Sequence, residues 1–242
     1  MKGYYCFAGI DFELETVHAY VHELCKDYLV PKSSGIRIVT GTEEIDFERH
    51  KSALEDKAEG IPIRSFSDEY LESLAVYRKI AELMPKFETV LFHGSCIAVN
   101  GEGFLFTAKS GTGKSTHTHL WRKLLGSKAI MVNDDKPLIK IGETEVMAFG
   151  TPWDGKHGLS SNITVPLKAI CILERAKDNS ITPITKQEAY PVLLQQIYRP
   201  ADPDMLKRTL SLIDRLNVKL YRLSCNMDIS AAELAYSTLK GF

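Results

Sequence analysis

The sequence predicts an α/β protein with a mixed sheet, preceded by a smaller α/β region. Three observations predict this class. Strand-like and helix-like segments alternate along the chain. A glycine-rich loop, AKSGTGKS at residues 108–115, separates an apolar strand-like segment from a helix-like one. The hairpin-type turn NGEG at residues 100–103 precedes that strand, so the strand should have an antiparallel neighbour.

The first third of the chain predicts two strands and one helix. Residues 4–12 and 36–47 resemble strands, the second because it begins with a β-branched run. Ser67 precedes two acids and a periodic apolar set, as expected for a capped helix. Pro85 ends that helix, so we expect an N-terminal α/β region of unassigned role at residues 1–85 and a phosphate-loop domain at residues 86–242.

In the second region, the residue pattern predicts the strands and helices of the mixed sheet. Strands are expected at residues 90–99, 104–108, 128–135, 166–174 and 219–223, with a further hairpin around Gly142. Helices are expected at residues 115–125, 187–198, 203–216 and 230–239. Gly126 fits the end of the first of these helices.

Composition excludes several classes of protein. The net charge is −1 and no basic stripe is present, so nucleic acid is not an expected partner. The sequence has no run of eighteen apolar residues, so no membrane span is predicted. The N-terminus does not resemble a signal peptide, and we therefore expect a cytoplasmic protein. The five cysteines are far apart and never form a C-x-x-C pair, so neither a disulfide framework nor a zinc site is expected.

The loop itself predicts a phosphate-binding site for ATP and Mg²⁺. Glycines can turn successive N–H groups inward around phosphate oxygens, and the following helix directs its positive end at them. Lys114 can reach the β- and γ-phosphates, and the Ser115 hydroxyl can bind Mg²⁺. Ala108 stands where the pattern usually has glycine. The expected nucleotide contacts are Ser110, Gly111, Thr112, Gly113, Lys114, Ser115 and Thr116. The alternative is a glycine-rich turn without a ligand.

Two adjacent acids, Asp134 and Asp135, end the next predicted strand. If this strand returns parallel and adjacent to the strand before the loop, its C-terminal end lies beside the phosphates. One acid there can hold Mg²⁺, and its neighbour, which points another way, can accept a proton from an attacking hydroxyl. The alternative is a solvated turn before Pro137.

These features resemble, in order, the HPr kinase/phosphorylase family and its relative phosphoenolpyruvate carboxykinase. The resemblance covers about residues 90–139: a His93-Gly94 pair, a hairpin, SGTGKS, one helix, and a strand ending in Asp-Asp. The segment at residues 149–173 looks like that of small HPr-kinase-related proteins.

The resemblance implies a fold and a set of roles. The fold would be the carboxykinase-like variant of the phosphate-loop architecture. Lys114 and Ser115 would bind phosphates and Mg²⁺, Asp134 would be the metal-side acid, and Asp135 would be the general base. His93 would lie beside the transferred phosphoryl group. The chain lacks a counterpart of the C-terminal glycine-rich signature of HPr kinases and is about half as long as a carboxykinase, so HPr as acceptor, phosphorolysis and decarboxylation are not implied.

Two further residues, Lys156 and Arg199, are candidate contacts of the substrate. Lys156 lies in a glycine-rich polar loop of the kind that often covers a site, so it can contact the γ-phosphate or the acceptor. Arg199 is a candidate clamp for a phosphoryl group. His117 and His119, spaced by two on the predicted helix, face different sides and are expected to pack or to lie on the surface.

The predicted function is ATP- and Mg²⁺-dependent transfer of the γ-phosphoryl group to a hydroxyl on a peptide, a protein or a small molecule. The alternative from another class is a regulatory or accessory module that binds nucleotide without transferring it. Hydrolysis, with water as acceptor, is a third reading. The acceptor, the donor preference and the oligomeric state stay open.

Overall fold

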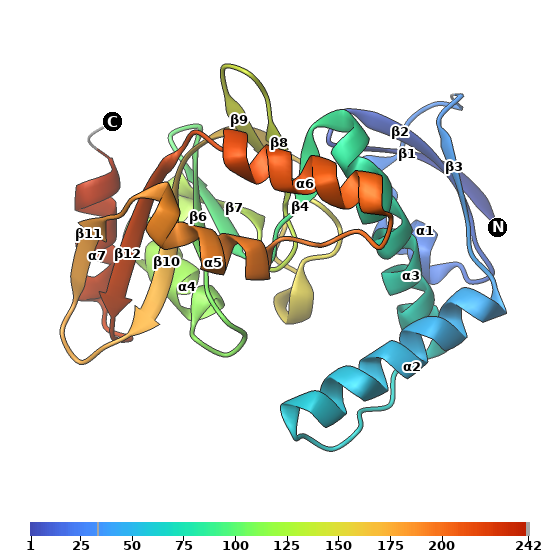
Figure 1. Cartoon of the computed structure of the whole chain (residues 1–242), viewed down its shortest axis with the longest axis horizontal. Coiled ribbons are helices and arrows are strands. Elements are labelled where there is room, and N and C mark those ends of the chain that lie inside the picture. Colours follow the sequence, from blue (N-terminus) through green and yellow to red (C-terminus); the bar gives the residue numbers. More distant parts are fainter. Residues whose placement is uncertain (33, 241–242) are drawn as a thin grey trace. The chain divides into compact units, whose positions relative to one another are not determined.

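The computed structural model describes residues 1–32 and 34–240 and contains two compact units, Met1–Leu83 and Met84–Phe242 (Figure 1). Within the described residues, none of the helices has both the length and the apolar character that a membrane span requires. We describe each unit by itself.

The first unit combines a three-stranded sheet with three helices (Figure 1). The sheet has the order β1-β2-β3, in which β1 and β2 are antiparallel and β2 and β3 are parallel. Its elements are β1 (Lys2–Phe7), β2 (Ile10–Glu15), α1 (Tyr20–Leu24), η1 (Lys26–Tyr28), β3 (Ile36–Val39), α2 (Thr42–Glu59) and α3 (Asp68–Leu83).

Two strand predictions in this unit are wrong. Residues 4–12 are not one strand, because Ala8 and Gly9 have φ angles of 52° and 79° and reverse the chain between β1 and β2. The strand predicted at residues 36–47 stops at Val39, and α2 begins at Thr42. Glu44 explains the switch, because its carboxylate accepts from the Gly41 N–H at 2.9 Å and caps the start of the helix.

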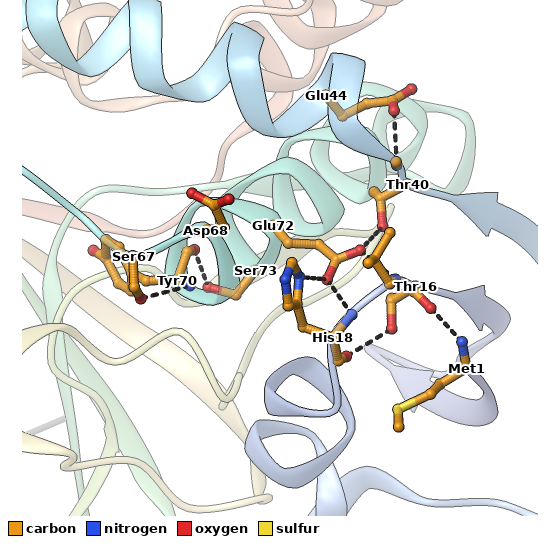
Figure 2. A network of polar contacts seen from close by, with 12 residues as sticks. Met1, Thr16, His18, Thr40, Glu44, Ser67, Asp68, Tyr70, Glu72 and Ser73 are labelled. Atoms are coloured by element: carbon orange, nitrogen blue, oxygen red, sulfur yellow. Dashed lines mark hydrogen bonds and ion pairs between the residues drawn. The ribbon is translucent and has the colours of Figure 1, made fainter.

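A buried carboxylate ties α3 to two loops of the first unit (Figure 2). Glu72 is fully buried and accepts from the backbone N–H groups of Val17 and His18, at 2.7 and 2.8 Å. The Thr40 hydroxyl donates to it at 2.7 Å, and His18 Nδ1 lies 2.9 Å from the same carboxylate. The ends of β2 and β3 are therefore fixed to the same helix.

The second unit contains the phosphate loop and a mixed sheet. Its strands are β4 (Thr89–Leu91), β5 (Ser95–Val99), β6 (Glu102–Thr107), β7 (Ala129–Asn133), β8 (Leu138–Ile141), β9 (Val146–Phe149), β10 (Thr164–Arg175), β11 (Ser180–Pro183) and β12 (Lys219–Cys225). Its α-helices are α4 (Lys114–Leu125), α5 (Lys186–Gln196), α6 (Pro203–Arg215) and α7 (Ile229–Leu239). Short 3₁₀ turns are η2 (Met84–Phe87), η3 (Gly126–Lys128) and η4 (Gly155–His157).

The sheet order is β4-β8-β9-β10-β6-β5-β7, and β12 pairs with β10 and β11. Strands β6, β10 and β12 are parallel, whereas β5 runs antiparallel to both β6 and β7. The mixed sheet is therefore confirmed. The expected adjacency of the strand before the loop and the strand that ends in the two acids is wrong, because β5 lies between them. Strands β6 and β7 still run the same way, since each is antiparallel to β5.

The predicted hairpin before the loop is confirmed. Val99 pairs with Glu102, which leaves Asn100 and Gly101 as a two-residue turn. Both have positive φ angles, 53° and 80°, as a type I′ hairpin requires. The strand predicted at residues 90–99 is interrupted, however, and β4 and β5 are separate strands that flank His93.

Helices cover both faces of this sheet (Figure 1). One core cluster joins the sheet to α5 and α6, and the other joins it to α4 and α7. Alternate residues of β10 enter the two clusters, for example Ile170 the first and Cys171 the second. A strand buried on both faces reads as a continuous apolar run, which is why residues 166–174 predict a buried strand.

Candidate active site

The phosphate loop connects the end of β6 to the start of α4. Gly111 and Gly113 have φ angles of 77° and 123°, in the region that favours glycine. Ala108 does not have a positive φ, so the missing glycine of the motif is not required there. Ser110, Gly111 and Thr116 are exposed, while Thr112, Gly113 and Ser115 are partly exposed. The loop and the first turn of α4 are therefore accessible to a ligand.

Lys114, the first residue of α4, is buried beneath this loop. Its ammonium donates to the Ala108 carbonyl at 3.1 Å, across the loop. Burial lowers the pKa of Lys114, and the charges of Asp135 and Asp134 act in the opposite direction. The cation of the loop and the two acids after β7 therefore lie close enough to interact.

Asp134 is held rigidly. It is buried, and its Oδ1 accepts from the Ser95 hydroxyl at 2.6 Å. The Thr118 hydroxyl lies 2.8 Å from that of Ser95 and 3.5 Å from Asp134 Oδ1. Sequence reasoning missed Ser95 and Thr118. Their hydroxyls come from β5 and α4 and orient a carboxylate that faces the helix of the phosphate loop.

Asp135 occupies a more open environment. Its side chain is 27% exposed, against 5% for the whole of Asp134, so a substrate can reach it. Its Oδ1 lies 3.5 Å from His93 Nε2, and its Oδ2 lies 3.4 Å from Lys136 Nζ. The Asp135 carbonyl accepts from the Gly94 N–H at 3.0 Å. The two adjacent acids thus have different surroundings, one closed and one accessible.

A fully buried amide, Asn133, sets the turn that carries both acids. Its Oδ1 accepts from the N–H groups of Asp135 and Lys136, at 2.8 and 2.6 Å. Its Nδ2 donates to the carbonyl of Thr151 at 2.9 Å and to that of Trp153 at 3.3 Å. Sequence reasoning missed this residue, although an Asn at a strand end before a turn is a usable signal.

His93 lies between β4 and β5, and Gln196 contacts both its ring and its backbone. Its Nδ1 is 2.8 Å from Gln196 Oε1, and its backbone N–H donates to the Gln196 carbonyl at 2.7 Å. Because an amide oxygen only accepts, Nδ1 carries the proton and Nε2 faces Asp135. Burial and the charge of Lys114 lower the pKa of His93, against the opposing effects of Asp135 and Gln196. Gln196, which comes from the end of α5, was not predicted.

The two candidate substrate cations lie on exposed segments. Lys156 belongs to η4, and the preceding Gly155 lies against Asp135, since a Cβ built on Gly155 would be 3.1 Å from Asp135 Cβ. Arg199 follows Gln196 by three residues and is also exposed. Among the described residues, neither Lys156 nor Arg199 forms an ion pair.

A third acid near the site, Asp154, was not predicted. Burial raises its pKa, and the nearby Asp134 and Asp135 add to that effect, while the hydrogen bond from Ser160 opposes it. The Ser160 hydroxyl donates to Asp154 at 2.8 Å. The loop between β9 and β10 therefore brings negative charge to the same region as the two strand-end acids.

A cavity of about 260 Å³ opens beside Ser115 and Asp134. Its walls combine the residues that could hold Mg²⁺ with cationic or titratable groups of α4 and η4. They include Ser115, Asp134, Thr118, His119, Arg122 and His157. Among the described residues, no set of three or more His, Cys, Asp or Glu side chains is arranged as a metal site. Mg²⁺ that accompanies a nucleotide usually has one or two protein ligands and completes its shell with phosphate oxygens and water.

The two histidines of α4 lie as expected from their spacing. His117 is buried and accepts from Trp121 Nε1 at 3.0 Å, and its ring meets that of Phe106 edge-on. His119 is exposed. The two do not face each other.

The chain belongs to the family described as "SynChlorMet cassette protein ScmC", whose model matches residues 63–200. No curated protein matches it in sequence. Among solved structures, the Hpr(Ser) kinase/phosphatase from Coxiella burnetii is similar, with a TM-score of 0.38 and 10% identity. That match covers 61% of this chain and 95% of the other. A likeness at this level supports no correspondence between individual residues.

Proposed function

We propose that this protein is an ATP- and Mg²⁺-dependent phosphotransferase that moves the γ-phosphoryl group to a hydroxyl on a peptide, a protein or a small molecule. One observation carries the proposal: a glycine-rich loop with a buried lysine lies beside two adjacent acids with different surroundings. Phosphoryl transfer needs these parts, because its catalysis consists of positioning and charge stabilisation.

The loop fits the phosphates of a nucleotide. The positive φ angles of Gly111 and Gly113 are those of a loop whose N–H groups turn toward an anion. The start of α4 adds the partial positive charge of a helix N-terminus. In our proposal Lys114 exchanges its contact with the Ala108 carbonyl for phosphate oxygens, and residues 110–116 contact the nucleotide.

The metal would be held by Ser115 and Asp134. These are a hydroxyl and a carboxylate, the oxygen ligands that Mg²⁺ prefers, and both line the same cavity. When bound, the metal neutralises charge on the phosphates. Ser95 donates a hydrogen bond to Oδ1 of Asp134 and so orients this carboxylate.

Asp135 would be the general base and His93 its partner. The accessible Asp135 carboxylate accepts the proton of the acceptor hydroxyl as the hydroxyl attacks phosphorus. His93 Nε2, which carries no proton, lies near Oδ1 of Asp135, whereas Lys136 lies near Oδ2. We assign Lys156 and Arg199 to charge contacts with the transferred group or the acceptor, since both are exposed cations on segments next to Asp135 and His93.

The test is phosphoryl transfer detected by mass spectrometry. The protein is incubated with ATP and Mg²⁺ against serine-containing peptides and a pool of small hydroxylated metabolites, and nucleotide affinity is measured in parallel by calorimetry. A product that gains one phosphate with wild type, but not with Lys114→Ala or Asp135→Asn, supports the proposal. Tight ATP binding without transfer to any acceptor would favour the nucleotide-binding module. Phosphate release without an acceptor, well above background, would favour a hydrolase.

A further inference from the structure

The cavity beside Ser115 and Asp134 has a cationic end that the proposed metal site does not use. Four of its lining residues come from α4, namely Ser115, Thr118, His119 and Arg122. Their spacing of i, i+3, i+4 and i+7 places them in one stripe along the helix. The stripe begins at the proposed Mg²⁺ ligand and ends at Arg122, about 10 Å further along the helix axis.

Arg122 is the group of this stripe that is suited to an anion. It is only partly buried, and among the described residues it forms neither an ion pair nor a hydrogen bond. Long side chains on a helix lean back toward the helix N-terminus, which directs the guanidinium toward the turn of Thr118 and so toward the metal end of the cavity. A planar guanidinium pairs best with a carboxylate or a phosphate, through two parallel hydrogen bonds. The cavity therefore offers a cation to an anionic group.

The short turn η4 connects this cavity to Asp135. Gly155, at the start of η4, lies against Asp135, since a Cβ built on it would be 3.1 Å from Asp135 Cβ. His157, at the end of the same turn, lines the cavity and is exposed. An imidazole donates a hydrogen bond in its neutral and in its charged form. A molecule of a few carbon atoms can therefore extend from Asp135 into the cavity along a single turn of chain.

We propose that the phosphoryl acceptor is a small hydroxylated molecule that also carries a carboxylate or a phosphate, and that Arg122 binds this anionic group. The inference rests on the proposed function, because it takes Asp135 to receive the proton of the attacking hydroxyl. The hydroxyl lies at Asp135 and the anionic group lies in the cavity, where His119 and His157 are further donors. The volume of about 260 Å³ is slightly below that of sites for drug-sized ligands, which favours a small molecule over a peptide or a protein.

The first test measures how three matched probes bind to the nucleotide-loaded protein. Sorbitol, gluconate and sorbitol 6-phosphate share a six-carbon hydroxylated chain, so a hydroxyl is available at every spacing, and they differ in their charged group. The protein is first saturated with Mg²⁺ and the non-hydrolysable analogue AMP-PNP, so that the phosphate loop is occupied. NMR spectra of the imidazole C–H groups of His119 and His157 then follow each titration. We expect gluconate or sorbitol 6-phosphate to bind at least about tenfold more tightly than sorbitol.

Arg122→Gln and Lys123→Gln separate a specific contact from general charge. Both remove one positive charge from the last turn of α4, but Lys123 is exposed and does not line the cavity. In Arg122→Gln the advantage of the anionic probe over sorbitol should fall to about twofold or less, whereas Lys123→Gln should retain it. The affinity for Mg²⁺-AMP-PNP should stay within about twofold of wild type in both variants. A loss of AMP-PNP affinity in Arg122→Gln alone would overturn the inference, because the cavity would then hold part of the nucleotide.

The second test asks whether the bound probe is an acceptor. The probe that binds most tightly is incubated with Mg²⁺-ATP, and mass spectrometry detects a product that has gained one phosphate. We expect this product with wild type and Lys123→Gln, much less of it with Arg122→Gln at the same probe concentration, and none with Asp135→Asn. Binding without transfer would overturn the assignment of the cavity to the acceptor.

The outcomes separate this inference from the proposed function. If Mg²⁺-AMP-PNP does not bind, the proposed function fails. If it binds but the three probes bind equally or not at all, only the acceptor inference is overturned. If an anionic probe is preferred and Arg122→Gln removes the preference, the inference is supported, and the tighter of the two anionic probes tells a carboxylate site from a phosphate site.

Discussion

His93 Nε2 and Asp135 Oδ1 lie 3.5 Å apart, on segments that are 42 residues apart in the chain. The Nε2 atom of His93 carries no proton in this arrangement, because Gln196 accepts from the opposite ring nitrogen. If Asp135 takes up a proton, His93 Nε2 is a second acceptor 3.5 Å away. In our proposal this pair receives the proton that the acceptor hydroxyl loses during transfer.

Asp135→Asn should abolish this function without removing the nucleotide. We expect transfer to fall by about 10²–10⁴-fold, the usual contribution of a general base, with the dissociation constant for Mg²⁺-ATP within about twofold of wild type. Steady-state kinetics and calorimetry check the two halves. A large loss of nucleotide affinity in this variant would instead assign Asp135 to the metal.

Gln196→Leu should slow transfer through His93. Losing the 2.8 Å contact to Nδ1 frees the ring to rotate away from Asp135, and a misplaced catalytic group can reduce the rate by about tenfold to a hundredfold. Gln195→Leu is the matched control, since Gln195 is exposed and adjacent. Equal rates in Gln196→Leu and the control would show that His93 needs no positioning. Unchanged nucleotide affinity in both variants would exclude a general loss of structure.

Lys114→Ala should weaken nucleotide binding itself. The buried ammonium is the loop's own cation, and its removal takes away a charge-assisted hydrogen bond to phosphate. We expect affinity for Mg²⁺-ATP to fall by at least about tenfold, equivalent to about 1.4 kcal/mol. Lys109→Ala, an exposed lysine of the same loop, should stay within about twofold. Similar losses in both would mean that the loop attracts nucleotide only through overall charge.

Asn133→Ala should destabilise the second unit and disorder both acids. It removes a single acceptor, Asn133 Oδ1, which takes two hydrogen bonds from the turn at residues 134–136, and leaves the N–H groups of Asp135 and Lys136 unpaired. An unsatisfied group costs about 1–3 kcal/mol when it is buried, and these two N–H groups are only partly buried, so we expect a loss near the lower end for the pair, about 2–3 kcal/mol in the free energy of unfolding. Urea denaturation measures it. Wild-type stability together with full transfer would contradict the role of Asn133.

The local parts of the site could be predicted from sequence, because their signals are local. The hairpin at Asn100-Gly101, the loop at residues 108–115 and the helix that follows are encoded by residues with restricted backbone preferences. The helices in the last third were also predicted to within about two residues, since their apolar periodicity is long. The reduced strand at residues 36–39 shows the limit, because one carboxylate of Glu44 caps a helix where the β-branched run suggested a continuing strand.

The non-local parts could not be predicted. Gln196 reaches His93 across 103 residues, and Ser95 reaches Asp134 across 39. No pattern in one sequence links such pairs, because they meet only through the strand order. That order was itself misjudged: β5 lies between β6 and β7, where an adjacent parallel pair was expected. Polar residues at the ends of other strands are thus the group that sequence reasoning finds least readily.

Glu72→Gln should destabilise the first unit and change how its stability depends on pH. Burial acts to raise the pKa of Glu72, but the hydrogen bonds from Val17, His18 and Thr40 outweigh it, so the pKa is lower than its ordinary value of 4.5. A lowered native pKa means that the stabilisation is fully present above about pH 4.5 and is lost as the pH falls through the native value.

The substitution Glu72→Gln places amide protons next to N–H groups that donate to the carboxylate in the wild-type protein. We expect a loss of about 1–3 kcal/mol at pH 7, which shrinks as the pH falls below about 4.5 because the stabilisation of wild type by the Glu72 charge is then being lost. Denaturant unfolding at pH 7 and at pH 3.5 measures both, with the exposed Glu69→Gln on the same helix as control. A difference between Glu72→Gln and wild type that stays constant across this range would mean that the network in Figure 2 does not depend on the charge of Glu72.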